Sequence, residues 1–223
     1  MDSKTAMIKS DFIKPNLRCD DQKYEFIIIL DRSSSMDGDK IVLAKQALHF
    51  ALQSLPVSCF FNVVAFNGTH SMIFEASQPY TQENICIAKK FLDGINAMGY
   101  TNLFPVLQDI LSSKPVPAHL RQLYIITDGQ VSQPKETIEL VAHNRQRWRC
   151  FTIGIGKDVD FNNIREIASS SGGTYAFAHE SKSIRSELIT QFKTTLLPGA
   201  LKPVIVPRVQ NLLGPGTPTS LTT

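Results

Sequence analysis

The 223-residue sequence predicts an α/β fold: a doubly wound, mostly parallel six-stranded sheet with helices on both faces and one antiparallel edge strand. Three observations predict this class. Short apolar runs rich in β-branched residues alternate with longer segments whose apolar residues recur every three or four positions. The runs carry almost no charge, which is typical of strands buried on both faces. A hairpin signal, Asn67-Gly68, joins two of the runs and places one strand antiparallel at an edge.

Each predicted strand is an apolar run bounded by polar or turn-forming residues. The run that ends in Leu30 and the run that ends in Thr127 have the composition of central strands. The segment after Asn67-Gly68 is short and is expected at the antiparallel edge. In chain order, the predicted strands are Phe26–Leu30, Cys59–Phe66, Met72–Phe74, Gln122–Thr127, Arg149–Ile155 and Thr174–Ala178.

The predicted helices combine apolar residues at three- and four-residue spacing with residues that start or stop helices. Pro56 ends the first helix and Thr81 caps the second. Pro134 opens the fourth helix, and Gly172-Gly173 ends the fifth. The predicted helices are Asp39–Leu55, the segment from its cap Thr81 to Ile95, Phe104–Leu111, Pro134–Asn144, a segment capped by Asp160 or Asn162, and Ile184–Leu196.

The chain is long enough for one domain with a substantial core. Residues 1–23 are polar and without clear periodicity, and we interpret them as a lead-in from another part of a larger protein. Residues 24–198 form the predicted domain. Residues 199–223 are rich in proline and are predicted to be a flexible tail.

The composition excludes several classes of function. A net charge of +3 is too small to indicate a nucleic-acid partner. No apolar stretch approaches a membrane-spanning length, and no apolar segment of a signal peptide follows Met1. The four cysteines form no CxxC pair, so we expect free thiols and a cytoplasmic protein. Secretion as part of a larger precursor is the alternative.

Oxygen-bearing side chains follow two of the predicted central strands. Asp31, Ser33 and Ser35 leave the first strand at alternate positions, so they can point the same way in an extended segment. Asp128 follows the fourth strand, and Thr101 lies in a turn-like stretch before a helix. In open parallel sheets, ligands bind at the carboxyl ends of the strands. Carboxylate and hydroxyl oxygens suit a hard, oxygen-preferring cation better than a soft metal.

These pieces are an Asp-x-Ser-x-Ser stretch, a Gly-x-Thr loop and a Thr-Asp-Gly strand end. Together they resemble the metal-ion-dependent adhesion site of a von Willebrand factor type A domain. The resemblance covers about Glu25 to Leu197. Within the family, Ser54-Leu55-Pro56 and the segment Cys150–Gly156 are similar to the intracellular branch related to the inter-alpha-trypsin inhibitor heavy chains. Ser34 and Tyr100 stand where the family commonly has glycine, and both add a side chain beside the site.

The resemblance implies a role in protein recognition, without catalytic residues. The implied cation is Mg²⁺, and Mn²⁺ is also possible. Ser33, Ser35 and Thr101 would supply neutral oxygens to this cation. Asp31 and Asp128 would bind it directly or through water. An acidic side chain of a protein partner, Asp or Glu, would then complete the coordination shell. Such domains usually belong to larger multidomain proteins.

Other interpretations stay open. A structural domain with an unused site ranks second, and a Mg²⁺-dependent hydrolase built on Asp31 and Asp128 ranks third. The segment Asp31–Ser35 alone also fits a helix-capping turn, and Thr101 fits a cap for the helix near Phe104. We interpret Asp39 as a helix cap, in preference to a ligand for a neighbouring cation.

Two further motifs have simple explanations. Asn67-Gly68-Thr69 matches a glycosylation acceptor, but a hairpin turn explains it fully. The basic and aromatic segment Arg145–Arg149 could contact phosphate. We interpret it as a solvated helix end that leads into a strand.

Overall fold

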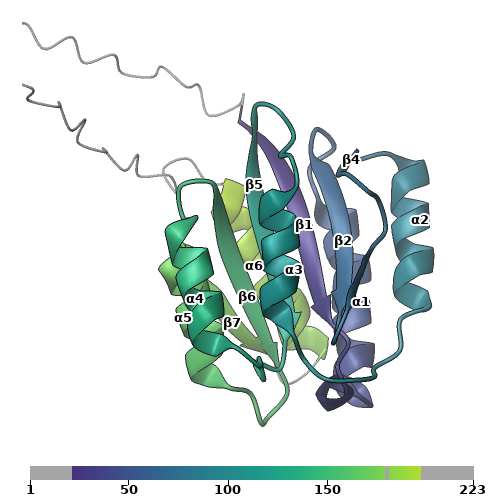
Figure 1. The fold of residues 1–223 in the computed structure, drawn as a ribbon. Coiled ribbons are helices and arrows are strands. Elements are labelled where there is room, and N and C mark those ends of the chain that lie inside the picture. The colour runs from purple at the N-terminus through teal and green to yellow at the C-terminus, as the bar shows by residue number, and fades with distance from the viewer. Residues whose placement is uncertain (1–21, 179–180, 197–223) are drawn as a thin grey trace, which may run out of the picture.

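A computed structural model describes residues 22–178 and 181–196 of the chain. Its centre is a sheet in the order β3-β2-β1-β5-β6-β7, with the short β4 also paired to β2 (Figure 1). The strands are β1 (Lys23–Asp31), β2 (Phe60–Phe66), β3 (His70–Met72), β4 (Gln78–Pro79), β5 (His119–Thr127), β6 (Trp148–Ile155) and β7 (Tyr175–Ala178). β3 and β4 pair antiparallel with β2, whereas the other neighbouring strands pair parallel. The predicted fold class is confirmed.

Helices cover both faces of the sheet (Figure 1). α1, α2 and α6 contribute to the core on one face, and α3, α4 and α5 cover the other. The helices are the short 3₁₀ turn η2 (Ser34–Met36), α1 (Asp39–Ser54), α2 (Gln82–Asp93), α3 (Leu103–Ser112), α4 (Pro134–His143), α5 (Phe161–Ser170) and α6 (Ser181–Leu196). Alternate residues of β1 serve the two faces: Ile28 and Leu30 pack in one core, and Ile27 and Ile29 in the other.

The predicted N-caps of α2 and α5 are confirmed, whereas that of α1 is not. Thr81 caps α2 by accepting a hydrogen bond from the backbone N–H of Asn84 at 3.2 Å. Of the two caps proposed for α5, the structure selects Asp160, which accepts from the N–H of Asn163 at 3.1 Å. The prediction for Asp39 was wrong. Gly38 is the N-cap of α1, and Asp39 is its first helical residue.

Two details of the sheet differ from prediction. The six predicted strands become seven, because the two-residue strand β4 also pairs with β2. Its Pro79 is a residue that sequence patterns associate with turns, and it is tolerated here at an edge. β3 begins at His70, because the turn after Asn67 is tight: the Asn67 N–H donates to the carbonyl oxygen of Thr69 at 2.8 Å.

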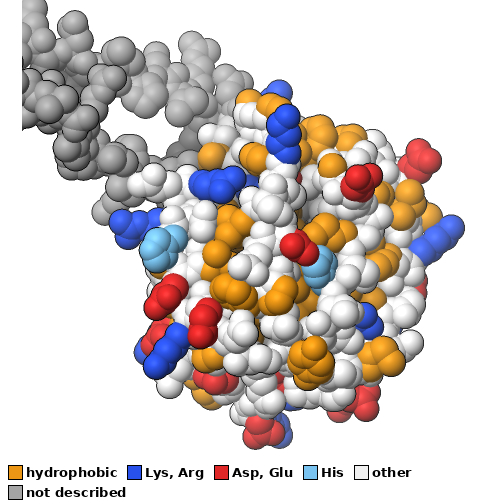
Figure 2. Space-filling model, in the orientation of Figure 1, with side chains coloured by type: hydrophobic (Ala, Val, Ile, Leu, Met, Phe, Trp, Pro, Cys, Tyr) orange, Lys and Arg blue, Asp and Glu red, His pale blue; other side chains and the backbone are white. Residues whose placement is uncertain are grey.

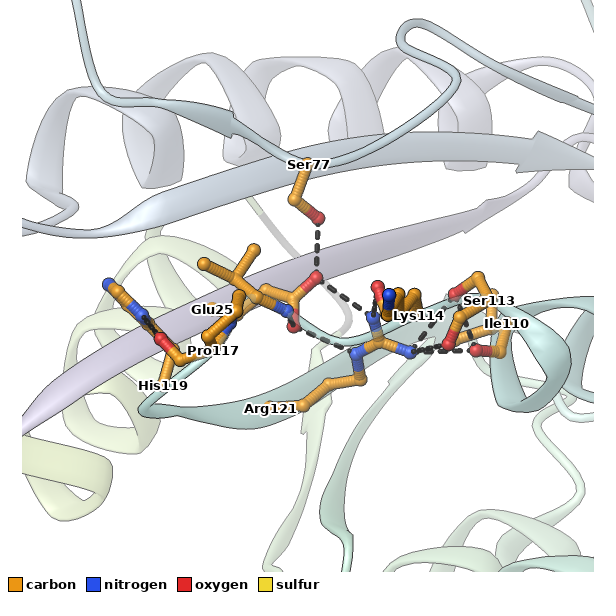
Figure 3. A network of polar contacts seen from close by, with 9 residues as sticks. Glu25, Ser77, Ile110, Ser113, Lys114, Pro117, His119 and Arg121 are labelled. Carbon is orange, nitrogen blue, oxygen red and sulfur yellow. Dashed lines mark hydrogen bonds and ion pairs between the residues drawn. The ribbon is translucent and has the colours of Figure 1, made fainter.

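A buried ion pair lies at the amino ends of the two central strands (Figure 3). Arg121 of β5 donates from Nε and Nη2 to the two carboxylate oxygens of Glu25 in β1, at 2.9 and 3.0 Å. Ser77 Oγ and the N–H of Val116 also donate to this carboxylate. Arg121 further donates to backbone carbonyls at the C-terminal end of α3, including that of Ile110 at 2.7 Å. The pair therefore joins β1, β5 and α3.

The surface carries no concentrated basic patch on the face seen in Figure 2, where positive and negative side chains are interspersed. In the segment Arg145–Arg149, the first three residues are exposed beyond α4, and Trp148 and Arg149 are buried at the start of β6. The interpretation as a helix end leading into a strand is confirmed.

None of the helices within 22–178 and 181–196 is long and apolar enough to cross a membrane. Apart from residues 22 and 23, the predicted lead-in lies outside the described residues, as does the predicted tail.

The three cysteines within the described residues are free, as predicted, and their environments differ. Burial raises the pKa of the Cys59 thiol and of the Cys150 thiol to about 12 each, whereas Cys86 is exposed on α2. The thiolate is the reactive form, so we expect rapid alkylation of Cys86 and slow alkylation of Cys59 and Cys150 in the native protein. Mass spectrometry after a short maleimide pulse, with a Cys86→Ser control, measures this. Fast native labelling of Cys150 would contradict the buried position of β6. Cys19, also predicted to be free, lies outside the described residues.

Candidate metal centre

The predicted site lies where the parallel strands end, at the lower end of the sheet in Figure 1. β1 ends with Asp31, and β5 ends with Thr127 just before Asp128. Because these strands are parallel neighbours, their carboxyl ends lie side by side. The carboxylates of Asp31 and Asp128 are completely buried there. A cluster of oxygen atoms is thus fixed by the two central strands.

Asp31 is held by two short hydrogen bonds. Its Oδ1 accepts from the backbone N–H of Ser33 at 2.8 Å, and its Oδ2 accepts from the hydroxyl of Thr127 at 2.6 Å. Desolvation raises the pKa of Asp31 above its ordinary value, although these hydrogen bonds act in the opposite direction. The nearby charge of Asp128 raises it further. A cation at this position would favour the ionised carboxylate.

Ser33 and Ser35 bring two hydroxyl groups together. Their Oγ atoms are 3.0 Å apart, and both residues line an open pocket of about 360 Å³. Ser33 holds the N-cap position of η2, but its side chain makes no capping hydrogen bond, and Gly38 holds the N-cap position of α1. The alternative of a capping turn therefore does not describe these hydroxyls. Ser34, between them, is exposed to solvent.

Thr101 lines the same pocket from a separate loop. This loop is attached to the end of β1 by two backbone hydrogen bonds. The N–H of Met98 donates to the carbonyl oxygen of Arg32 at 2.7 Å, and the N–H of Ser34 donates to that of Gly99 at 2.8 Å. Ser132 Oγ also donates to the carbonyl oxygen of Thr101. The predicted alternative role of Thr101 as a helix cap is wrong, because Asn102 holds the N-cap position of α3.

Asn67 holds the other side of this loop, a role that the sequence analysis missed. Its Nδ2 donates to the carbonyl oxygen of Met98 at 2.8 Å, and its own carbonyl oxygen accepts from the N–H of Asn102 at 3.0 Å. The side chain is buried, so its amide nitrogen is not available for glycosylation in the folded domain. The Asn-Gly-Thr pattern predicts a hairpin turn or a glycosylation acceptor. It gives no sign that the Asn67 side chain also anchors the loop that contains Thr101.

We therefore expect Asn67→Ala to weaken Mg²⁺ binding by roughly tenfold, because the Thr101 loop loses one of its anchors. It should also lower the free energy of unfolding by about 1–3 kcal/mol, since the Met98 carbonyl loses its partner. Isothermal titration and urea unfolding measure the two effects. Thr69→Ala is the matched control, because it removes a hydroxyl from the same turn but none of the loop contacts described above. Equal Mg²⁺ affinity in all three proteins would contradict the anchoring role.

Asp128 has a partner that the sequence analysis also missed. Nζ of Lys40, in the first turn of α1, donates to Asp128 Oδ2 at 3.0 Å. The other oxygen, Oδ1, accepts a long hydrogen bond of 3.4 Å from the N–H of Gln130, which lines the pocket. No motif marks Lys40, since it lies outside the Asp-x-Ser-x-Ser stretch.

The donor set fits a hard divalent cation. In an octahedral Mg²⁺ shell with bonds of about 2.1 Å, adjacent ligands lie about 3.0 Å apart. The Ser33 and Ser35 hydroxyl oxygens have this separation. No group of three or more His, Cys, Asp and Glu residues that could hold a metal occurs in the described parts of the chain. The candidate centre instead combines two carboxylates with three neutral hydroxyls, which suits Mg²⁺ better than a soft metal.

Tyr100 forms part of the pocket rim and is 66% exposed. Its ring lies over Gly68: a Cβ atom at position 68 would lie only 2.6 Å from Tyr100 Cε1. The absence of a side chain at Gly68 thus creates space for the ring. Asp160 and Asn163 also line the pocket, but the Asp160 carboxylate already accepts hydrogen bonds from Asn163.

A family model described as the von Willebrand factor type A domain matches residues 24–177. The chain is 34% identical over 175 residues to the mouse von Willebrand factor A domain-containing protein 5B1, and 34% identical over 184 residues to human protein 5A. Each match covers 78% of this chain, but only 14% and 23% of those proteins. The chain therefore corresponds to a small part of these relatives.

Solved structures show the same fold. A von Willebrand factor type A protein from Catenulispora acidiphila superposes with a TM-score of 0.69 at 20% identity, over 78% of this chain and 43% of that one. Proximal thread matrix protein 1 from the mussel byssus, described with a zinc-occupied MIDAS motif, has a TM-score of 0.64 at 17% identity. That match covers 78% of this chain and 46% of the mussel chain. At these identities, the likeness concerns the fold alone.

Proposed function

This chain belongs to the von Willebrand factor type A domain family, and from that premise we propose that it is a divalent-metal-dependent protein-interaction module. It binds an acidic side chain of a protein partner through Mg²⁺, which Mn²⁺ can replace. The proposed ligands, direct or through water, are Asp31, Ser33, Ser35, Thr101 and Asp128. The observation that carries the proposal is that Ser33, Ser35 and Thr101, from two separate segments, line one open pocket next to the strand ends that hold two buried carboxylates.

The proposed ligands would contribute to cation binding in two ways, through neutral oxygen atoms and through negative charge. Ser33, Ser35 and Thr101 contribute oxygen atoms without charge, so they do not neutralise the ion. Asp31 and Asp128 are fixed by hydrogen bonds and contribute the negative charge. A bound divalent ion would supply a Lewis-acid position for an incoming carboxylate. The pocket that the three hydroxyl residues line is open to solvent, so a protruding Asp or Glu side chain can reach them.

A structural domain without a metal is the second candidate, and one observation favours it. The Lys40 ammonium already pairs with Asp128, so this carboxylate has a counter-charge without any metal. Catalysis has no comparable support. The carboxylate that lines the pocket, that of Asp160, is committed to Asn163 at the start of α5. We therefore propose binding rather than turnover.

The relatives are several times longer than this chain. We propose that the domain works within a larger multidomain protein in the cytoplasm. Free thiols at Cys59, Cys86 and Cys150 support a reducing compartment. The proposed partner is a protein that presents Asp or Glu, rather than a nucleic acid or a membrane.

The proposal is tested with a fluorescent peptide library in which each Asp- or Glu-containing peptide has an Asn- or Gln-containing twin. We expect binding of a subset of acidic peptides in millimolar Mg²⁺, loss in chelator, and recovery when Mg²⁺ is restored. Ser33→Ala combined with Ser35→Ala should reduce this binding, and Ser34→Ala should not, because Ser34 is exposed. Absence of Mg²⁺ or Mn²⁺ uptake by the wild type, even with acidic peptides present, would favour the structural domain.

A further inference from the structure

The environment of Lys40 differs from that of an ordinary surface lysine. Its ammonium is 3.0 Å from Asp128 Oδ2, and Asp128 is fully buried while the Lys40 side chain is 23% exposed. The aliphatic part of Lys40 passes over Gly156 at the end of β6. A Cβ atom at position 156, where φ is +107°, would lie 2.7 Å from Lys40 Cε. The absence of a side chain at Gly156 thus leaves space for the Lys40 side chain.

The charges of the centre can be counted from these contacts. The carboxylates of Asp31 and Asp128 together with the ammonium of Lys40 leave one net negative charge. A divalent cation would convert this into one net positive charge. One further carboxylate would restore neutrality. Without Lys40, the charges of the two carboxylates and of the divalent cation would already sum to zero.

We propose that Lys40 is a fixed positive charge of the metal centre that couples metal binding to binding of an acidic partner. Lys40 opposes Mg²⁺ when the ion binds alone, and it favours an added carboxylate once the ion is present. Because coupling between two ligands is reciprocal, the carboxylate must raise the affinity for Mg²⁺ by the same factor. This inference rests on the proposed function and identifies the residue that makes the centre depend on its partner.

The geometry allows Lys40 and a cation to act on Asp128 together. Lys40 contacts Oδ2, whereas Oδ1 has only the 3.4 Å contact with the N–H of Gln130. Gln130 lines the pocket together with Ser33 and Thr101, so the N–H that reaches Oδ1 comes from a residue of this pocket. The ammonium therefore need not leave when a cation binds near Oδ1.

The test uses Lys40→Met, which keeps most of the side-chain length and removes the charge. Lys157→Met is the matched control, because it removes one exposed positive charge close to the carboxyl end of β6 without touching Asp128. Lys40→Arg restores the charge. Isothermal titration with MgCl₂, with and without sodium acetate as the simplest carboxylate, gives the affinities. Thermal melting in chelator reports the metal-free ion pair.

Without acetate, we expect Lys40→Met to bind Mg²⁺ roughly threefold to tenfold more tightly than the wild type. Acetate should raise the Mg²⁺ affinity of the wild type and of Lys40→Arg, but raise that of Lys40→Met much less. In chelator, Lys40→Met should melt several degrees lower, because Asp128 loses its partner. Lys157→Met should match the wild type in each experiment.

Two outcomes would overturn the inference, and they differ in what they say about the function. If the wild type and Lys40→Met bind Mg²⁺ with the same affinity and the same acetate dependence, Lys40 does not couple the ligands, and the metal-dependent module survives. If neither protein takes up Mg²⁺ with or without acetate, the metal-dependent function fails and the coupling fails with it. An unchanged melting temperature of Lys40→Met in chelator would also count against the ion pair.

Discussion

Asp31→Ala is expected to abolish Mg²⁺ binding at millimolar concentrations of the ion while the domain remains folded. The substitution removes one of the two carboxylates that provide the negative charge of the centre. Alteration of a group that only supports metal ligands already costs 10- to 100-fold in metal affinity. Removing a charged group at the centre itself should cost about 100-fold or more. Ser33→Ala and Thr101→Ala should weaken binding less, since each removes a neutral oxygen.

The loss of Asp31 should change the free energy of unfolding less than it changes the Mg²⁺ affinity. The N–H of Ser33 and the hydroxyl of Thr127 both donate to this carboxylate in a buried position. Asp31→Ala leaves both donors without an acceptor, which lowers the free energy of unfolding by about 1–3 kcal/mol. Asp31→Asn keeps the shape and an acceptor for Ser33, so its loss of stability should be smaller. It should still lose most of its Mg²⁺ affinity.

Isothermal titration on Asp31→Ala, Asp31→Asn and a control, Asp39→Ala, distinguishes the effect of the lost charge on Mg²⁺ affinity from an effect of altered folding. Asp39 is exposed in the first turn of α1 and makes no contact with the proposed ligands in the hydrogen bonds described above. We expect the control to bind Mg²⁺ like the wild type, with circular dichroism unchanged in all three variants. Wild-type affinity in Asp31→Asn would show that Asp31 does not provide the charge of the centre.

The sequence predicted the position of a site residue wherever that residue directly follows a recognisable strand. Asp31 and Asp128 follow apolar runs, and the parallel pairing of those runs brings the two carboxylates together. Thr101 was included in the predicted site as a hydroxyl in a turn-like stretch and through the family resemblance, but nothing in its neighbours predicts that its loop lies against β1. The fold class followed from alternating patterns that are repeated along the chain. The roles of individual side chains depended on contacts between distant segments.

Lys40 and Asn67 show why the rest could not be predicted. The Lys40 contact with Asp128 spans 88 residues, and a lysine in the first turn of a helix is ordinarily a solvated residue. Asn67 stands in an Asn-Gly pair, which favours a hairpin, so its side-chain contact with Met98 had no separate signal. β4 was missed because two residues that include a proline provide no periodic pattern.

Glu25 illustrates the same limit in the core. It is a charged residue within an otherwise apolar strand, and it is 1% exposed. A buried carboxylate requires a partner, but the partner, Arg121, lies 96 residues away. The pair and its surrounding donors form a fully bonded network at the amino ends of β1 and β5 (Figure 3). This network gives the prediction with the largest effect on stability.

Arg121→Met is expected to lower the free energy of unfolding by about 3–5 kcal/mol, because it leaves Glu25 buried without a counter-charge. It also removes the donors that satisfy the carbonyl oxygen of Ile110 in the last turn of α3 and that of Lys114 just after α3. The double variant Glu25→Leu/Arg121→Met should recover part of this loss, since it removes the isolated carboxylate. Urea unfolding of the three proteins gives the coupling between the two positions.

Arg165→Met is the matched control, because it breaks an ion pair with Glu166 that is 3.9 Å long and more than half exposed on both sides. Its effect should stay below about 0.5 kcal/mol. If Arg121→Met were no more harmful than this control, the buried pair would not hold β1, β5 and α3 together. The Mg²⁺ affinity of the double variant should remain close to that of the wild type. Glu25 and Asp31 are separated along β1 by about 20 Å of extended chain, and the metal centre depends only on the far end of that strand.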